Sequence, residues 1–240
     1  MAFTGQNIAD EARGDLNDDD ALNYRWTDAD MLRYINAAQR RIVSIVPEAN
    51  VVEENVVIDN ADSRQTLPTG GIKFIGAFNY DATNSERGPA ITIVEKDALD
   101  SMSSDWSYVE VADLSFQYQN LETWHTAVRF EHAAHDSRDP TVYYLFPATD
   151  TATFEIQLQY AKVPTALTTL ADSFALGDQY FDAAVAFSKY RMHAKDGRHG
   201  GGSEVKQESY NDFLRALGQK IEGFRRVDPA VNRPPESPHG

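Results

Sequence analysis

The residues of this chain best suited to bind a metal ion are two histidines in the stretch FEHAAHDSRDP. His132 and His135 are three residues apart, with Glu131 and Asp136 beside them. On a helix this spacing would place both imidazoles on one face, where they could bind a metal. The stretch, however, lies just before Pro140 and between two predicted strands. We therefore expect a polar turn here rather than a metal site.

The acidic stretch DLNDDD, residues 15–20, is a second place to look for a metal ion. A calcium-binding loop needs Gly at its sixth position and Glu at its twelfth. A loop that starts at Asp15 has Asp20 and Trp26 at those positions. The pattern therefore favours a solvated acidic loop, and we predict neither a metal nor a cofactor.

Acidic residues close to aromatic ones leave one catalytic alternative open. Glu110 and Glu122 flank aromatic residues that include Trp106 and Trp124, and such a group could line a sugar cleft. The alternative function is therefore a carbohydrate-binding or carbohydrate-active β module with helical flanks. Other catalytic signatures are missing, including GxSxG, the P-loop, GxGxxG and HExxH. The chain also has no cysteine, which excludes a cysteine nucleophile, a thiolate zinc site and a disulfide scaffold.

The composition restricts the partners of the chain. Of its 240 residues 42% are apolar and 11% aromatic, which is enough for a real core, and the formal charge is −15. Such an acidic surface repels phosphate, so specific binding of nucleic acid is disfavoured. No run approaches the roughly 18 apolar residues of a membrane span. The first 20 residues also lack the basic start and apolar centre of a secretion signal.

The clearest element is a helix in the sequence WTDADMLRYINAAQRRIVSIVPEAN, residues 26–50. Thr27 is a good N-cap, Asp30 follows three residues later, and Pro47 ends the pattern. Gln39 and three arginines are expected on the outer faces. The apolar residues recur at helical spacing and form one stripe: Met31, Ile35, Ala38, Ile42 and Ile45. Before this helix, Ile8, Ala9 and Ala12 could support a short helix in an otherwise polar and acidic segment.

Residues 51–163 have a different character. Short runs of β-branched and aromatic residues are separated by Gly, Pro, Asn and Asp, which indicates several antiparallel strands. Gly70-Gly71 and Asn84-Ser85 mark turns, and EKDALDSM favours a short helix. In FEIQLQYA the alternation places four residues on one face of a strand: Phe154, Ile156, Leu158 and Tyr160.

After Pro164 the pattern becomes helical again. Residues 176–197 form a helix that begins near Asp178, and residues 203–226 form a second helix with Ser203 as its N-cap. The second helix carries an apolar stripe: Tyr210, Phe213, Leu214, Leu217, Ile221 and Phe224. Residues 227–240 hold four prolines and few apolar residues, so we expect an extended tail.

The cheapest way to bury the apolar stripes of these helices is to pack them together. The sequence therefore predicts an α+β fold: a helical bundle, made of one N-terminal helix and a C-terminal helix pair, with an inserted antiparallel β region and an extended C-terminal tail. The expected parts are 1–50, 51–165, 166–226 and 227–240. The expected bundle core consists of Met31, Ile35, Ile42, Phe213, Leu217 and Ile221.

Several pieces of the chain, in this order, resemble the head-to-tail adaptor (connector) proteins of tailed bacteriophages. They are the opening helix with its final proline, the segment VVIDNADSRQTLPTGGIKFIGAFNY, the pieces WHTA, PTVYYLFPAT and EIQLQYAKVPTAL, and the closing helix pair. The likeness covers most of residues 24–220. The acidic N-terminal segment and the proline-rich tail match no pattern of the family.

The resemblance implies a virion structural protein without enzyme activity. Such adaptors form a ring, usually a dodecamer, below the portal protein in the neck of the virion. They extend the DNA channel, through which DNA passes without specific binding, and present a platform to a tail, nozzle or stopper protein. They are made in the host cytoplasm. A neck or tail-tube completion protein would share the absence of catalytic motifs and differ only in its partner.

The resemblance also implies a role for the C-terminal tail, because this segment often docks onto the portal in such proteins. An extended tail can lie along a groove of another subunit, and its arginines could meet an acidic portal surface. The residues expected to dock are Arg225, Arg226, Val227, Pro229, Val231, Arg233, Pro234 and Pro235.

Overall fold

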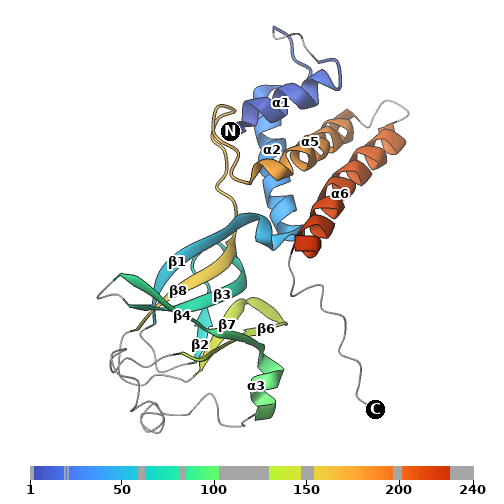
Figure 1. Ribbon diagram of the computed structural model, residues 1–240. Coiled ribbons are helices and arrows are strands. Elements are labelled where there is room, and N and C mark those ends of the chain that lie inside the picture. Colours follow the sequence, from blue (N-terminus) through green and yellow to red (C-terminus); the bar gives the residue numbers. More distant parts are fainter. Residues whose placement is uncertain are drawn as a thin grey trace, which may run out of the picture. The chain divides into compact units, whose positions relative to one another are not determined.

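The computed structural model describes residues 3–18, 20, 22–58, 63–81, 85–102, 130–146, 154–196 and 202–227 (Figure 1). The chain divides into two compact units. Residues 1–50 and 164–240 make a helical unit, and residues 51–163 make a β unit. The β unit is therefore an insertion in the sequence of the helical unit.

The helical unit begins with α1 (Gly5–Gly14) and α2 (Asp28–Ile45), followed by the short η1 (Pro47–Asn50). After the insertion come η3 (Asp178–Tyr180), α5 (Phe181–Asp196) and α6 (Gly202–Val227). Helix α5 contacts α1, α2 and α6, and α1 also contacts α2. The short helix predicted around Ile8 is thus confirmed as α1. Helix α2 also begins after Thr27 and ends before Pro47, as predicted.

The helix caps explain where α1 and α2 begin. At α1, the Thr4 hydroxyl accepts from the backbone N–H of Asn7 while the Asn7 side chain accepts from the N–H of Thr4, which completes a capping box. At α2, the Thr27 hydroxyl accepts from the N–H of Asp30. The Asp30 carboxylate does not complete a box, because it binds other side chains instead.

Three expectations about the helices are wrong in detail. Ser203 lies inside α6, one residue after the helix begins, so it is not the N-cap. Leu214 is 42% exposed, because the buried stripe of α6 passes through Phe213 and Leu217 instead. Gln39, expected on an outer face, is only 1% exposed because its amide oxygen binds the loop before α5.

Residues of the expected bundle core are found as follows. Met31, Ile35, Ile42 and Phe213 are fully buried, and Leu217 nearly so. Ile221 lies in α6, and its side chain is outside the described residues. The N-terminal segment also contributes to this core, because Ile8, Ala9 and Ala12 are fully buried.

The β unit contains two four-stranded sheets (Figure 1). The first has the order β1-β8-β3-β4, formed by β1 (Val51–Ile58), β8 (Phe154–Lys162), β3 (Gly71–Asp81) and β4 (Glu86–Ala90). The second has the order β2-β7-β6-β5, formed by β2 (Arg64–Thr66), β7 (Asp139–Phe146), β6 (His132–Asp136) and β5 (Thr92–Glu95). Helix α3 (Lys96–Met102) follows β5, where a short helix was predicted.

The alternation predicted for FEIQLQYA is present in β8. Ile156, Leu158 and Tyr160 are fully buried, while the side chain of Phe154 is outside the described residues. Strand β8 pairs with β1 in one unbroken register from Val51–Ala161 to Ile58–Phe154. A turn before β3 is closed by a hydrogen bond from Gly71 to Pro68, with Gly70 at a φ of +85°. A positive φ favours glycine, which explains why the turn predicted at Gly70-Gly71 has glycine at position 70.

The expectation of an antiparallel β region is wrong for one pair of strands. Strands β5 and β6 are parallel, from Thr92–His132 to Glu95–His135. A parallel pair requires a crossover of about a dozen residues or more, whereas a hairpin needs only a few. The connection from α3 to β6 is long enough for this, so the second sheet is mixed.

The core of the β unit lies on the inward-facing residues of both sheets. It includes Ile58, Phe74, Leu145, Ile156 and Leu158, all buried. The rings of Phe74 and Tyr143 stack with their centroids 5.1 Å apart. The hydroxyl of Tyr143 is buried without a hydrogen-bond partner in the described part of the chain, and burial raises the pKa of this phenol.

Candidate functional site

The two histidines considered for a metal site lie on strand β6, not in the polar turn that the sequence favoured. Residues three apart on a strand point to opposite faces. His135 Nε2 lies 3.0 Å from Glu95 Oε1 on the neighbouring strand, and the ring of His132 stacks on Phe146. Within the ranges that the structure describes, no group of three or more His, Cys, Asp or Glu side chains could hold a metal ion.

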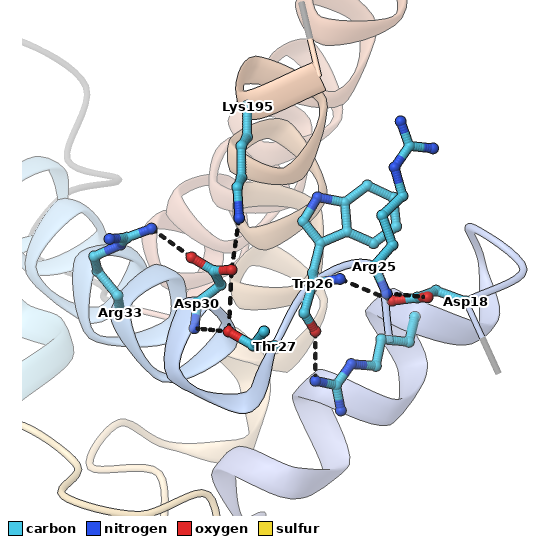
Figure 2. Close-up of polar contacts among 8 residues, drawn as sticks. Asp18, Arg25, Trp26, Thr27, Asp30, Arg33 and Lys195 are labelled. Carbon is cyan, nitrogen blue, oxygen red and sulfur yellow. Dashed lines mark hydrogen bonds and ion pairs between the residues drawn. The ribbon is translucent and has the colours of Figure 1, made fainter. Parts of the chain in front are cut away.

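The polar side chains of the helical unit converge at the start of α2 (Figure 2). The Asp30 carboxylate accepts hydrogen bonds from the Thr27 hydroxyl (3.1 Å), from Arg33 (2.6 Å) and from Lys195 of α5 (2.6 Å). The hydrogen bond from Lys195 is the largest cause that lowers the pKa of Asp30. Asp30 thus fixes the first turn of α2 against the last turns of α5.

The segment that joins α1 to α2 is held by a second polar group. Arg13, only 2% exposed, donates to the carbonyl of Trp26 (2.7 Å) and to Asp28 (2.8 Å). Its guanidinium carbon lies 3.7 Å from the centre of the Tyr24 ring. The Asp18 carboxylate accepts from the backbone N–H groups of Arg25 and Trp26, as Figure 2 shows. Asp18 is therefore part of a folded connection and not only of a solvated loop.

Phe3 and Thr4 pair with the loop that precedes η3. Thr4 forms a β-bridge with Ser173, and the N–H of Phe174 donates to the carbonyl of Phe3. The ring of Phe3 lies 4.4 Å from that of Phe181. A methyl group on Gly5 would come within 2.7 Å of Leu167, so the fit is close. The N-terminal segment is thus an integral part of the helical unit.

The loop 164–177 is fixed by side chains that the sequence patterns did not single out. Asn36 of α2 donates to the carbonyl of Leu167 (2.9 Å) and accepts from its N–H (2.8 Å). The Gln39 amide oxygen accepts from the N–H of Ala175 (2.9 Å). The Asp172 carboxylate accepts from the N–H and hydroxyl groups of Thr168 and Thr169, led by the N–H of Thr169, and these bonds hold its pKa well below the usual range.

A model of the SU10 adaptor protein family matches residues 3–235. The chain belongs to this family. The match includes the N-terminal segment and most of the proline-rich tail, so the expectation that neither fits the family pattern is wrong. Among curated proteins no match is found. The resemblance to phage head-to-tail adaptors is confirmed at the level of the family, and the chain is a bacteriophage structural adaptor and a virion component.

In this adaptor the charge is divided unequally between the two units. The β unit carries 18 acidic and 7 basic residues, a net charge of −11. The helical unit carries 19 acidic and 15 basic residues, a net charge of −4. Exposed carboxylates of the β unit include Glu53, Glu86, Glu95 and Asp97. An acidic surface of this kind repels the phosphates of DNA.

Two groups of residues singled out in the adaptor sequence lie mainly outside the described ranges. Of the tail residues expected to dock, Arg225, Arg226 and Val227 form the end of α6, and their side chains are not described. The other tail residues follow this helix and lie outside the described residues. So do the four residues of the alternative sugar cleft: Trp106, Glu110, Glu122 and Trp124. No helix in the described residues is long and apolar enough to cross a membrane.

Proposed function

We propose that the chain is the subunit of a ring that lies below the portal of a tailed bacteriophage and connects the head to the tail. The match to the SU10 adaptor family over residues 3–235 carries this proposal. The ring is a dodecamer with the portal protein on one side and a tail, nozzle or stopper protein on the other. It acts in the neck of the virion by binding and assembly, without catalysis and without a cofactor.

The charge of the β unit supports a channel through which DNA passes without specific binding. Its 18 acidic residues outnumber its 7 basic residues, so carboxylates that face the channel would repel the DNA backbone. In a ring, the same acidic surface is repeated by every subunit. Repetition therefore turns a modest local repulsion into a continuous acidic wall.

The contacts of α5 support a rigid platform formed by the helical unit. Helix α5 packs on α1, α2 and α6, as expected of a bundle that combines the N-terminal helix with the C-terminal pair. Lys195 and Asp30 join α5 to α2, and Lys189 binds Asp15 in the segment after α1. The tail follows α6. Arg225 and Arg226 at the end of this helix, together with Arg233 in the tail, dock onto the portal.

Electron microscopy of the chain mixed with the portal protein of the same phage tests the ring. We expect a ring stacked on the portal with a central channel. Portals that stay bare while the chain remains monomeric would overturn the proposal. Because the portal can act as a template, a monomer in the absence of portal does not decide the question.

Two variants test the role of the tail in the same assay. A chain that lacks residues 227–240 should fold normally, with unchanged thermal melting, and bind the portal more weakly. A full-length chain with Gln in place of Arg225, Arg226 and Arg233 keeps the length of the tail and removes three positive charges. Unchanged portal binding by both variants would show that the tail does not dock there.

Charge reversal tests the acidic channel. Replacing Glu86, Glu95 and Asp97 in the β unit by Lys should make portal-bound rings retain double-stranded DNA at low salt, and added salt should release it. The matched control makes the same change at the exposed Glu11, Glu204 and Glu208 of the helical unit. Equal DNA retention by both sets would contradict the assignment of the channel surface to the β unit.

A further inference from the structure

Strand β1 forms an open edge of its sheet within the described residues, since it pairs only with β8. It is eight residues long, and its register with β8 has no bulge. Two of its apolar side chains remain exposed, Val51 at 41% and Val57 at 51%. A long, regular edge with exposed apolar residues is a template on which another strand can pair.

The opposite edge of the same sheet is protected. Strand β4 has only five residues, contains Gly88 and Pro89, and pairs with β3 across a shift in register. Short length, proline and bulges are the usual means by which proteins prevent edge-to-edge pairing. The contrast between the two edges shows that β1 lacks a protection that β4 has.

The two carboxylates of β1 do not provide that protection, because they bind side chains of their own sheet. Glu53 accepts from the amide of Gln159 and lies 3.6 Å from Arg87. Glu54 accepts from the hydroxyl of Tyr160, and burial together with this bond raises the pKa of Tyr160 to about 12. Both carboxylates are thus drawn toward the neighbouring strand and away from the open edge.

The sequence of β1, VVEENVVI, matches a reversed copy of itself in one register. With Asn55 opposite the Asn55 of a second copy, Glu53 faces Val57 and Glu54 faces Val56, while Val52 faces Ile58. No carboxylate then lies opposite another. Two other registers of this kind are equally near. One places Glu54 opposite Glu54, which is destabilising. The other, centred on Val56, pairs only five residues of each strand instead of the seven that pair about Asn55. A slip of one residue would instead turn the buried face of one copy toward solvent.

We propose that two free copies of the chain pair antiparallel through β1 about a two-fold axis at Asn55. The pairing joins two four-stranded sheets into one sheet of eight strands, with the core faces of both copies on the same side. Neighbours in a ring of more than two subunits are not related by a two-fold axis. The β1 dimer is therefore a state of the unassembled chain, and it must open before a ring closes. This inference does not depend on the proposed ring.

Cysteine cross-linking tests the register directly, because the natural chain contains no cysteine. Residues directly opposite each other in an antiparallel pair have Cα atoms about 4.5–5.5 Å apart, which is within the range of a disulfide. Asn55→Cys should therefore give a disulfide-linked dimer under mild oxidation. Val57→Cys alone should not, because its counterpart lies four residues further along the partner strand, roughly 13 Å away.

Mixing two single-cysteine chains gives the decisive control. Glu53→Cys and Val57→Cys, carried on chains of different size, should form the mixed dimer and little of either like dimer. Equal cross-linking of all pairs would mean random collision and would overturn the proposal. So would an Asn55→Cys chain that stays monomeric under oxidation at high protein concentration.

A charge at the two-fold axis provides a test without cross-linking. In Asn55→Lys two ammonium groups face each other, and sedimentation equilibrium should show at least about fivefold weaker dimerisation. The same change at the exposed Asn211 of α6 is the control and should leave the dimer unchanged. Equal effects of both variants would overturn the proposal. Asn55→Lys should still form rings on the portal, so loss of the dimer and loss of the ring are separate results.

Discussion

The helical unit and the β unit are stabilised in different ways. In the helical unit, buried or partly buried polar side chains of α1 and α2 bind backbone groups far along the chain, as Asn36 binds Leu167 and Gln39 binds Ala175. In the β unit, regular alternation builds an apolar core, which includes the hydroxyl of Tyr143 without a partner among the described residues. The β unit also has a contact of this kind, in which Asn79 binds the N–H and the carbonyl of Phe130. We expect the stability of the helical unit to depend more on such polar contacts, and that of the β unit to depend mainly on its apolar core.

The largest expected effect comes from a charge placed in the core of the helical unit. Ile42 is fully buried, so Ile42→Asp puts an unpaired carboxylate among apolar side chains. We expect a loss of about 4 kcal/mol or more in the free energy of unfolding, measured by urea denaturation. Arg40→Asp at an exposed position of the same helix is the control. An unchanged melting temperature for Ile42→Asp would contradict the packing of α2.

Removal of one polar side chain tests the dependence on exact geometry. Asn36→Ala deletes both hydrogen bonds to the backbone of Leu167 and should cost about 2 kcal/mol. Asn211→Ala, at an exposed site on α6, should stay within about 0.5 kcal/mol of the natural chain. If the two variants were equally stable, the helical unit would not depend on this contact.

Two tyrosines of the β unit sharpen the comparison, because substitution by Phe should change the free energy of unfolding in different directions at the two positions. Tyr143→Phe removes a buried hydroxyl that has no partner in the described residues, so stability should be unchanged or rise by up to about 1 kcal/mol. Tyr160→Phe removes the hydrogen bond to Glu54 and should cost about 1 kcal/mol. Chemical denaturation of both variants measures the difference. A loss of stability in Tyr143→Phe would show that its hydroxyl has a partner.

The smallest expected effect is the loss, at acidic pH, of the stability that Asp172 contributes. Its hydrogen bonds to Thr168 and Thr169 lower its pKa below the ordinary 3.8. A lowered pKa in the folded state gives stability that is present above the ordinary pKa and is lost as the pH falls below it. The melting temperature of Asp172→Asn should thus approach that of the natural chain between about pH 5 and pH 2. A difference that stays constant with pH would contradict this role.

Local signals in the sequence were enough to predict both ends of α2 and the positions of most strands. Thr27 caps the start of α2 and Pro47 stops its end, and both effects depend only on neighbouring residues. The alternation in β8 arises because only one face of the strand packs on the core. The parallel pairing of β5 with β6 was missed, because it depends on a partner that follows a long connection. The same reason applies to Asn36 and Gln39, whose partners are more than 130 residues away.

The position of the β unit between α2 and the later helices has a consequence for synthesis. When residues 1–50 leave the ribosome, the apolar sides of α1 and α2 have no α5 to cover them. At common rates of translation, the inserted residues 51–163 take on the order of ten seconds to make. The β unit can fold once its last strand has been made, because β8 lies between β1 and β3. The first two helices still wait for α5 at that point, with apolar surface exposed. The nascent chain therefore passes through a stage in which its middle is finished before its beginning.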